Sequence, residues 1–156
     1  MGVQLRPMRD DEFPAWLPQV RDGYARSMID HGGFTPEAAG KKAQADTEQL
    51  FPGGKPSAEQ LVFVIEADGE SVGDLWLAKR DDMSGRPCLF VYDVNVAEAH
   101  QGRGYGKAAM LFAEEEARRR GVDRVALNVF GRNEVARRLY LSLGYEENAV
   151  AMSKTL

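Results

Sequence analysis

The chain lacks the features that mark membrane, secreted and metal-binding proteins. It has one cysteine, so no internal disulfide can form, and its two histidines, His31 and His100, show no metal-ligand spacing. No apolar run approaches the roughly 20 residues that a membrane-spanning helix needs, and residues 1–6 lack the apolar core of a signal peptide. We therefore expect a cytoplasmic protein with no metal site and no membrane partner.

Basic residues are also few compared with acidic ones. Lys and Arg number 20 against 24 Asp and Glu, which gives a net charge of -4. Binding along a nucleic acid backbone relies on clustered Lys and Arg, so no nucleic acid partner is expected. An acidic surface tolerates cationic acceptors, although many proteins carry this balance only for solubility. With 44% hydrophobic and 28% charged residues, the chain fits one globular domain over residues 1–156.

What the chain does contain is a glycine-rich segment between a predicted strand and a predicted helix. Residues 101–107 read Gln-Gly-Arg-Gly-Tyr-Gly-Lys. Alternating glycines let a backbone approach an anion without interference from Cβ atoms, and the first amides of a helix have no intrahelical partner. The segment therefore predicts a socket for a pyrophosphate. Taken alone, it fits equally well a tight turn with exposed basic residues.

Glycine spacing distinguishes three phosphate-binding patterns. A P-loop requires G-x-x-x-x-G-K-[ST], but Gln101 stands at its first glycine and Ala108 at its hydroxyl position. A dinucleotide fingerprint requires G-x-G-x-x-G, whereas Gly102, Gly104 and Gly106 are spaced G-x-G-x-G. The pattern that fits is Q-x-x-G-x-G, with Gln101, Gly104 and Gly106 in its fixed places. It resembles the coenzyme A-binding segment of the GNAT superfamily of N-acetyltransferases.

A second motif follows downstream, in the order that this family has. Residues 133–145 read N-x-x-A-x-x-x-Y-x-x-x-G-Y, with Asn133 and Tyr140 where GNAT enzymes carry their second cofactor-contacting helix. The resemblance covers residues 89–156 closely and the rest of the chain more loosely. It implies an acetyl-CoA-dependent N-acetyltransferase in which a primary amine attacks the thioester directly. Acetyl-CoA would be the co-substrate, and the acceptor would be a small-molecule or protein amine.

Hydrophobic periodicity and turn residues predict the order β-α-α-β-β-β-α-β-α-β. Strands are expected at residues 3–8, 61–65, 72–78, 89–96, 125–129 and 149–155, and helices at 10–28, 35–50, 104–120 and 133–143. The fold class is α/β, with a mixed, mostly antiparallel sheet of six to seven strands flanked by about four helices. This order matches the GNAT fold, which implies that the strands 89–96 and 125–129 splay apart around the pantetheine arm.

The resemblance also implies which residues hold the cofactor. Backbone amides of residues 102–107 would bind the pyrophosphate, with Arg103 and Lys107 adding charge-assisted contacts. Backbone groups of Val94 and Val96 would pair with the pantetheine amides as a strand does, and the Val96 amide is a natural oxyanion donor. The expected cofactor-binding set is Val94, Val96, Gln101, Gly102, Arg103, Gly104, Tyr105, Gly106, Lys107, Asn133 and Tyr140. For Asn133, capping of its own helix is the alternative role.

Two side chains are candidates for proton transfer. Tyr140 occupies the place of the family's proposed general acid, and a phenol of pKa about 10 can protonate a thiolate of pKa about 8.5. Asp93 would lie beside the thioester, where burial would raise its pKa toward a useful value. Each has a structural alternative, Tyr140 as a packed ring and Asp93 as a hydrogen-bonded carboxylate. Glu66 and a water chain are rival bases, and Cys88 is expected to be a small core residue.

Alternation along the strand 89–96 predicts its two faces. Phe90, Tyr92, Val94 and Val96 would share one face, and Val91, Asp93 and Asn95 the other. Asp93 would then point away from the face that carries Val94.

The acceptor and the assembly are less constrained by the sequence. The family implies an acceptor pocket built from the first two helices, around Trp16, Tyr24 and residues 31–34 and 51–56, although these residues could equally pack the helices together. Dimers are common among related folds, so a homodimer is one expected assembly. Two other functions stay open: a non-catalytic acyl-CoA-binding module, and a nucleotide-binding protein if the glycine spacing is misread.

Overall fold

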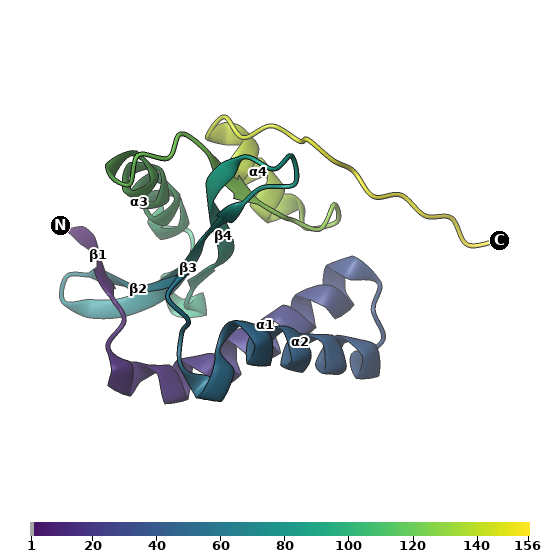
Figure 1. The fold of residues 1–156 in the computed structure, drawn as a ribbon, viewed down its shortest axis with the longest axis horizontal. Helices are drawn as coiled ribbons and strands as arrows, with labels where there is room; N and C mark the ends of the chain where they lie inside the picture. The colour runs from purple at the N-terminus through teal and green to yellow at the C-terminus, as the bar shows by residue number, and fades with distance from the viewer. Residues whose placement is uncertain (1) are drawn as a thin grey trace.

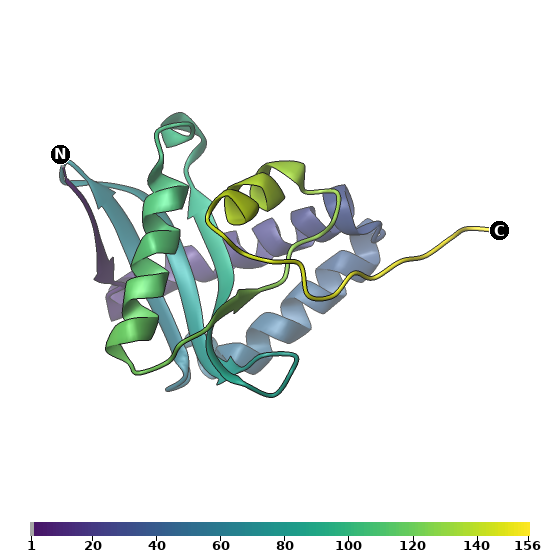
Figure 2. The same ribbon diagram turned by 90° about the horizontal axis from the view of Figure 1, so that it is seen from above.

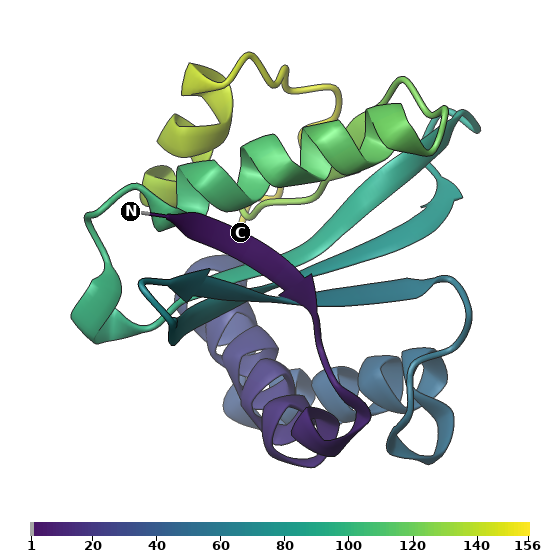
Figure 3. The same cartoon turned by 90° about the vertical axis from the view of Figure 1, so that its left-hand side faces the viewer.

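Four α-helices lie on the two sides of a central sheet in the computed structural model, which describes residues 2–156 (Figure 1). Met1, the first residue of the expected domain, lies outside the described residues. Helices α1 (Phe13–Gly32) and α2 (Pro36–Leu50) cover one face of the sheet, and α3 (Tyr105–Arg119) and α4 (Glu134–Ser142) lie on the opposite side (Figure 3). The predicted α/β class and its four helices are confirmed.

The sheet has the order β1-β2-β3-β4-β5. Its strands are β1 (Val3–Pro7), β2 (Gln60–Ala67), β3 (Glu70–Asp81), β4 (Pro87–Val96) and β5 (Val125–Leu127). The first four pair antiparallel, and β5 pairs parallel to β4 after the crossover through α3. Three short 3-10 turns complete the described elements: η1 (Asp10–Glu12), η2 (Pro52–Gly54) and η3 (Glu98–His100).

The expected strand count of six to seven is wrong, since the described residues form five strands. The missing strand is the one expected at 149–155. Residues 146–156 are exposed and extended, and they lead away from the sheet (Figure 2). Alternating apolar residues favour a strand, but a strand also needs a neighbouring edge that can pair with its backbone groups. This segment pairs with no strand among the described residues.

Two apolar layers hold the helices against the sheet. On the α3 side, Ile65, Leu75 and Leu89 are fully buried together with Met110 of α3. On the α1 side the layer is aromatic, with Trp16 and Phe51 packed edge-on against Trp76 of β3. Because each large side chain removed from water contributes about 1.5–3 kcal/mol, these layers fix β3 and β4 at the centre of the fold.

A β-bulge in β4 overturns the expected strict alternation of its side chains. Trp76 pairs with Asp93 and Leu77 with Val91, so Tyr92 is the extra residue. Tyr92 stacks on Trp76 on the α1 side, whereas Val94 packs with Leu75 and its neighbours in the α3-side layer. A bulge places two residues opposite one and so reverses the parity beyond it. Val94 therefore does not share the face of Phe90 and Tyr92.

Residues 2–156 contain neither a membrane-spanning helix nor a metal-binding cluster. Over residues 2–156, no helix combines the length and the apolar character needed to cross a bilayer. No group of three or more His, Cys, Asp and Glu side chains within the same residues is arranged to hold a metal ion.

Candidate functional site

The strands β4 and β5 pair over three residues only, and then part. The paired residues are Leu89 with Val125, Phe90 with Ala126, and Val91 with Leu127. Beyond Val91, β4 continues to Val96 with β3 as its strand partner. The separation expected from the resemblance is therefore present, and we call this point the splay. It leaves one edge of residues 92–96 uncovered by β5.

Backbone orientation shows which residues present polar groups to this open edge. The amide of Ala97 donates to the Val72 carbonyl of β3 at 2.9 Å. Because successive residues of a strand direct their backbone groups to opposite edges, the N–H and C=O of Val96 face away from β3, and those of Val94 do the same. The two residues expected to pair with pantetheine thus turn their amides toward the open edge.

Gln101 connects the glycine-rich loop to this strand. Its side-chain amide donates to the carbonyl oxygen of Val96 at 3.0 Å. The glutamine of the Q-x-x-G-x-G pattern therefore braces the loop against the end of β4. The resemblance marked Gln101 as a binding residue without indicating this bond.

The glycine-rich loop ends in the first turn of α3. Gly102 and Gly104 adopt φ of 78° and 85°, and Gly104 is the N-cap of α3, with no side-chain oxygen capping the helix. The intrahelical bond to the Gly104 carbonyl comes from Ala108, so the preceding amides of Tyr105, Gly106 and Lys107 have no partner within the helix. Unpartnered amides at a helix N-terminus, together with the helix dipole, favour a negative charge. Arg103 and Lys107 are exposed beside it.

Helix α4 supplies the two residues of the second motif. The side-chain oxygen of Asn133 accepts from the amide of Ala136 at 3.3 Å, so Asn133 caps α4. Tyr140 is half-buried against the α3-side layer, and its ring meets Tyr145 edge-on at 6.1 Å. Tyr145 in turn donates its hydroxyl to Glu114 of α3 at 3.1 Å. Packing against α3 thus fixes the position of Tyr140.

Asp93 of β4 and Tyr140 of α4 are coupled electrostatically. Burial raises the pKa of Asp93 to about 7, and the nearby carboxylate of Asp74 adds to this shift. Burial also raises the pKa of Tyr140, and the charge of Asp93 acts in the same direction. The two proton-transfer candidates are therefore electrostatic neighbours, although they come from β4 and α4.

Asp74 is a member of this site that the sequence did not reveal. It lies on β3 with 9% of its surface exposed, and its Oδ2 accepts from the Asn95 amide at 3.3 Å. Its Oδ1 and the buried Nε1 of Trp16 lack hydrogen-bond partners among the described residues. Burial raises the pKa of Asp74, and the nearby Trp16 indole and Asn95 partly offset this effect. The sequence does show one signal, since Asp74 is an acidic residue within an apolar strand. Its proximity to Asp93, however, depends on the pairing register of β3 with β4.

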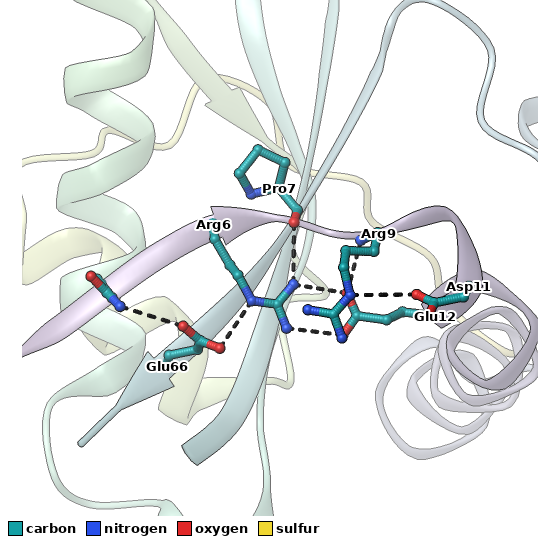
Figure 4. A network of polar contacts seen from close by, with 7 residues as sticks. Arg6, Pro7, Arg9, Asp11, Glu12 and Glu66 are labelled. Carbon is teal, nitrogen blue, oxygen red and sulfur yellow. Dashed lines mark hydrogen bonds and ion pairs between the residues drawn. The ribbon is translucent and has the colours of Figure 1, made fainter. Parts of the chain in front are cut away.

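Two rival groups are engaged elsewhere. The carboxylate of Glu66 accepts from Arg6 at 2.9 Å and from Gln4 at the β1 side of the sheet (Figure 4). Arg6 also bonds both oxygens of Glu12 in the same network, which holds the pKa of Glu12 at about 2. A carboxylate paired in this way, two strands from β4, is not placed to act as the base. Cys88 is buried, and burial raises the pKa of its thiol, contrary to what a nucleophile needs.

The residues expected to form an acceptor pocket pack largely against one another. Trp16 and Phe51 belong to the aromatic layer, and Phe51 is only 1% exposed. Tyr24 donates its hydroxyl to Asp46 of α2 at 3.1 Å. Two surface hollows lie away from the splay, one of about 430 Å³ beside Cys88 and one of about 500 Å³ between α1 and α2. For Trp16 and Phe51, the packing alternative is the one that the structure shows.

Comparisons with known proteins agree with this geometry. The profile of the Acetyltransferase (GNAT) family matches residues 19–145. The uncharacterized N-acetyltransferase YycN of Bacillus subtilis is 30% identical over the full length of both chains. A mycothiol acetyltransferase of Thermobispora bispora is 36% identical over 92% of this chain, which spans 46% of that protein.

Solved structures show the same fold. The crystal structure of YycN from Bacillus subtilis superposes with a TM-score of 0.88 at 29% identity, over 99% of each chain. The aminoglycoside N-acetyltransferase AAC(6')-Iy, solved in complex with CoA, has a TM-score of 0.66 at 18% identity, over 99% of this chain and 95% of its own. The family profile and the full-length similarity to YycN show that this chain is an acyltransferase and a member of the GNAT acetyltransferase family.

Proposed function

We propose that this enzyme transfers an acetyl group from acetyl-CoA to a primary amine, which attacks the thioester directly. The proposal rests on Asp93 of β4, whose charge acts on Tyr140 of α4, and on the open edge that β4 has beyond the splay. The open edge of β4 and the helix N-terminus at Gly104 supply the means to hold the donor nearby. All are contained in one domain over residues 1–156.

The donor is held mainly by backbone groups. Amides of residues 102–107 bind the pyrophosphate at the N-terminus of α3, where Arg103 and Lys107 add positive charge. Backbone groups of Val94 pair with the pantetheine arm along the open edge, and the amide of Val96 faces the thioester carbonyl at the end of that arm. Asn133 contacts the cofactor from the start of α4 while it caps that helix. Gln101 contributes by holding the loop against Val96.

Asp93 acts as the general base. A pKa of about 7 leaves an appreciable fraction of this carboxyl ionised at neutral pH, while its basicity is far above that of an exposed aspartate. It removes one proton from the ammonium of the acceptor, and the free amine then attacks the thioester carbonyl. Asp74 does not touch the reacting atoms but acts through Asp93, because its negative charge raises the pKa of the base.

Val96 and Tyr140 complete the transfer. The amide of Val96 donates to the oxyanion that forms when the amine attacks. As the carbon–sulfur bond breaks, the hydroxyl of Tyr140 gives its proton to the leaving thiolate. The nitrogen of the tetrahedral intermediate gives up its extra proton to water, and water or the protonated base then restores the phenol. The raised pKa of Tyr140 keeps this hydroxyl protonated at neutral pH, as an acid must be.

Release of free thiol from acetyl-CoA tests this proposal. The acceptor panel should contain small amines, including amino sugars, polyamines and amino acids, and peptides with free amino groups. We expect thiol release that depends on both acetyl-CoA and one class of amine, with the acetylated product identified by mass spectrometry. Calorimetric binding of acetyl-CoA without transfer to any amine would instead favour the acyl-CoA-binding module, and preference for ATP or NAD over CoA would contradict the cofactor assignment.

A further inference from the structure

Gly73 of β3 lies opposite Val96, the last residue of β4. One residue beyond this pair, the amide of Ala97 donates to the Val72 carbonyl. The backbone groups of Gly73 and Val96 therefore point away from each other, as in the narrow kind of antiparallel pair, whose Cα atoms lie about 4.5 Å apart. The open half of β4 thus ends against a glycine.

No side chain fits at position 73 without a shift of β4. A Cβ atom there would overlap the carbonyl oxygen of Asn95 and would lie 3.1 Å from Cα of Val96. Both neighbours are backbone atoms, so neither can rotate away as the end of a side chain does. A glycine within a strand is typical of such a close approach of two backbones. The backbone at Asn95 and Val96 therefore lies where it does because residue 73 has no side chain.

A β-bulge in β3 directly precedes Gly73. On the side of β2, Gly73 pairs with Ile65, whereas Ser71 pairs with Glu66. Val72 is therefore an extra residue of β3, and a bulge of this kind bends its strand. The close approach to β4 thus belongs to the bent end of β3, beside the open half of β4.

Val96 is also held from its other side. The side-chain amide of Gln101 donates to the Val96 carbonyl at 3.0 Å, on the open edge of β4. The amide of Val96 faces the same edge, because the N–H and C=O of one strand residue point to the same side. Gly73 and Gln101 therefore restrain this peptide from opposite sides, and together they fix the direction of its N–H group.

We infer that Gly73 is a positioning residue for acetyl transfer, because its missing side chain lets β3 hold the Val96 amide where the oxyanion forms. This inference rests on the proposed function, which takes that amide as the oxyanion donor. Such a donor must lie roughly 2.7–3.1 Å from the oxyanion, and a misplacement of about 1 Å can cost about 10²-fold in rate. Relief of the overlap between a Cβ atom and the Asn95 oxygen requires a shift of this order. Gly73 itself touches no reacting atom.

Gly73→Ala tests this role through the split between kcat and KM. With an amine that the wild type acetylates, kcat per folded molecule should fall by about 10²-fold. The KM for acetyl-CoA should stay within about threefold, since the pyrophosphate site at residues 102–107 is unchanged. Gly40→Ala is the matched control, because a Cβ at that position in α2 meets nothing within 4 Å. Leu89→Ala controls for lost stability, since it removes a fully buried side chain, and it should keep kcat.

The thioester carbonyl gives a readout that does not depend on turnover. Acetyl-CoA labelled with ¹³C at this carbonyl should show a downfield resonance when it binds the wild type, because a hydrogen bond from Val96 polarises the carbonyl. The amide proton of Val96 should move downfield in the same titration. In Gly73→Ala both resonances should return toward their values in the free cofactor and the free protein. A role in folding alone would not produce this change in a folded variant.

The outcomes separate the inference from the function on which it rests. A Gly73→Ala variant with wild-type kcat, or with the wild-type carbonyl shift, would overturn the role of Gly73 and leave the proposed function standing. A wild type that acetylates no amine would remove the proposed function and this inference with it. If Gly73→Ala does not fold, the wild-type titration decides, because a Val96 amide that stays unmoved by acetyl-CoA means that there is no donor to position.

Discussion

The two halves of β4 are both extended strand, but one is part of the core and the other has an open edge. Residues 89–91 have a strand on each side and are buried, and they carry only apolar side chains. Residues 92–96 have a strand on one side, and they carry Asp93 and Asn95. The first half contributes to the core, whereas the second leaves its backbone and two polar side chains available. Where a strand has a neighbour on one side only, its backbone groups on the other side stay free to bind a ligand.

The largest effect on turnover is expected from Asp93→Asn, in the half of β4 that pairs with β3 alone. This substitution keeps the size of the side chain but removes the base, so turnover should fall by about 10²- to 10⁴-fold. Steady-state thiol release measures the loss, and calorimetry should show that acetyl-CoA still binds. A variant with full turnover would remove Asp93 from the chemistry and leave it as a structural carboxylate.

The same substitution should change stability with a defined pH dependence. The folded-state pKa of Asp93, about 7, lies above the value of an unfolded aspartate. Folding therefore favours the protonated form, and the associated stability is present below about pH 4 and is lost as the pH rises through 7. At pH 8, the free energy of unfolding of Asp93→Asn should exceed that of the wild type by about 1–3 kcal/mol, so the variant unfolds at a higher denaturant concentration. The advantage should disappear near pH 4. An equal difference at both pH values would contradict the shift.

Leu89→Ala tests the paired half. Leu89 of β4 is fully buried in the α3-side layer, so truncation should cost about 2–5 kcal/mol of unfolding free energy. Turnover per folded molecule, corrected by active-site titration, should stay near that of the wild type because Leu89 lies before the splay. If Leu89→Ala kept full stability but lost as much turnover as Asp93→Asn, the paired half would also contribute to catalysis, contrary to this comparison.

Tyr140→Phe sharpens the assignment of the acid. It removes one hydroxyl and keeps the packed ring, so we expect turnover to fall by about 10²-fold with little change in stability. The rate should recover partly with an acyl donor whose thiol leaves more easily, since such a thiol needs less protonation. If the variant loses stability and keeps its rate, the ring is a packing residue.

The smallest effect is expected from Gln101→Ala. Loss of the bond to the Val96 carbonyl removes a brace worth about 1 kcal/mol, so the KM for acetyl-CoA should rise by roughly fivefold at unchanged kcat. Gln101→Glu is the matched control, because it keeps the length but not the donor. A rate loss without a change in KM would mean that Gln101 does more than hold the loop.

The sequence by itself determined the elements and the type of site. Gly102 and Gly104 take the left-handed backbone that the loop needs, and Asn133 caps the helix that carries Tyr140, because local chemistry decides turns and caps. Only the tertiary structure decided which side chains meet. The bulge at Tyr92 reverses the faces of β4, and the register of β3 brings Asp74 to Asp93. The strand expected at residues 149–155 is absent for the same reason, because alternation predicts an extended segment but not the path that would bring it beside a sheet edge.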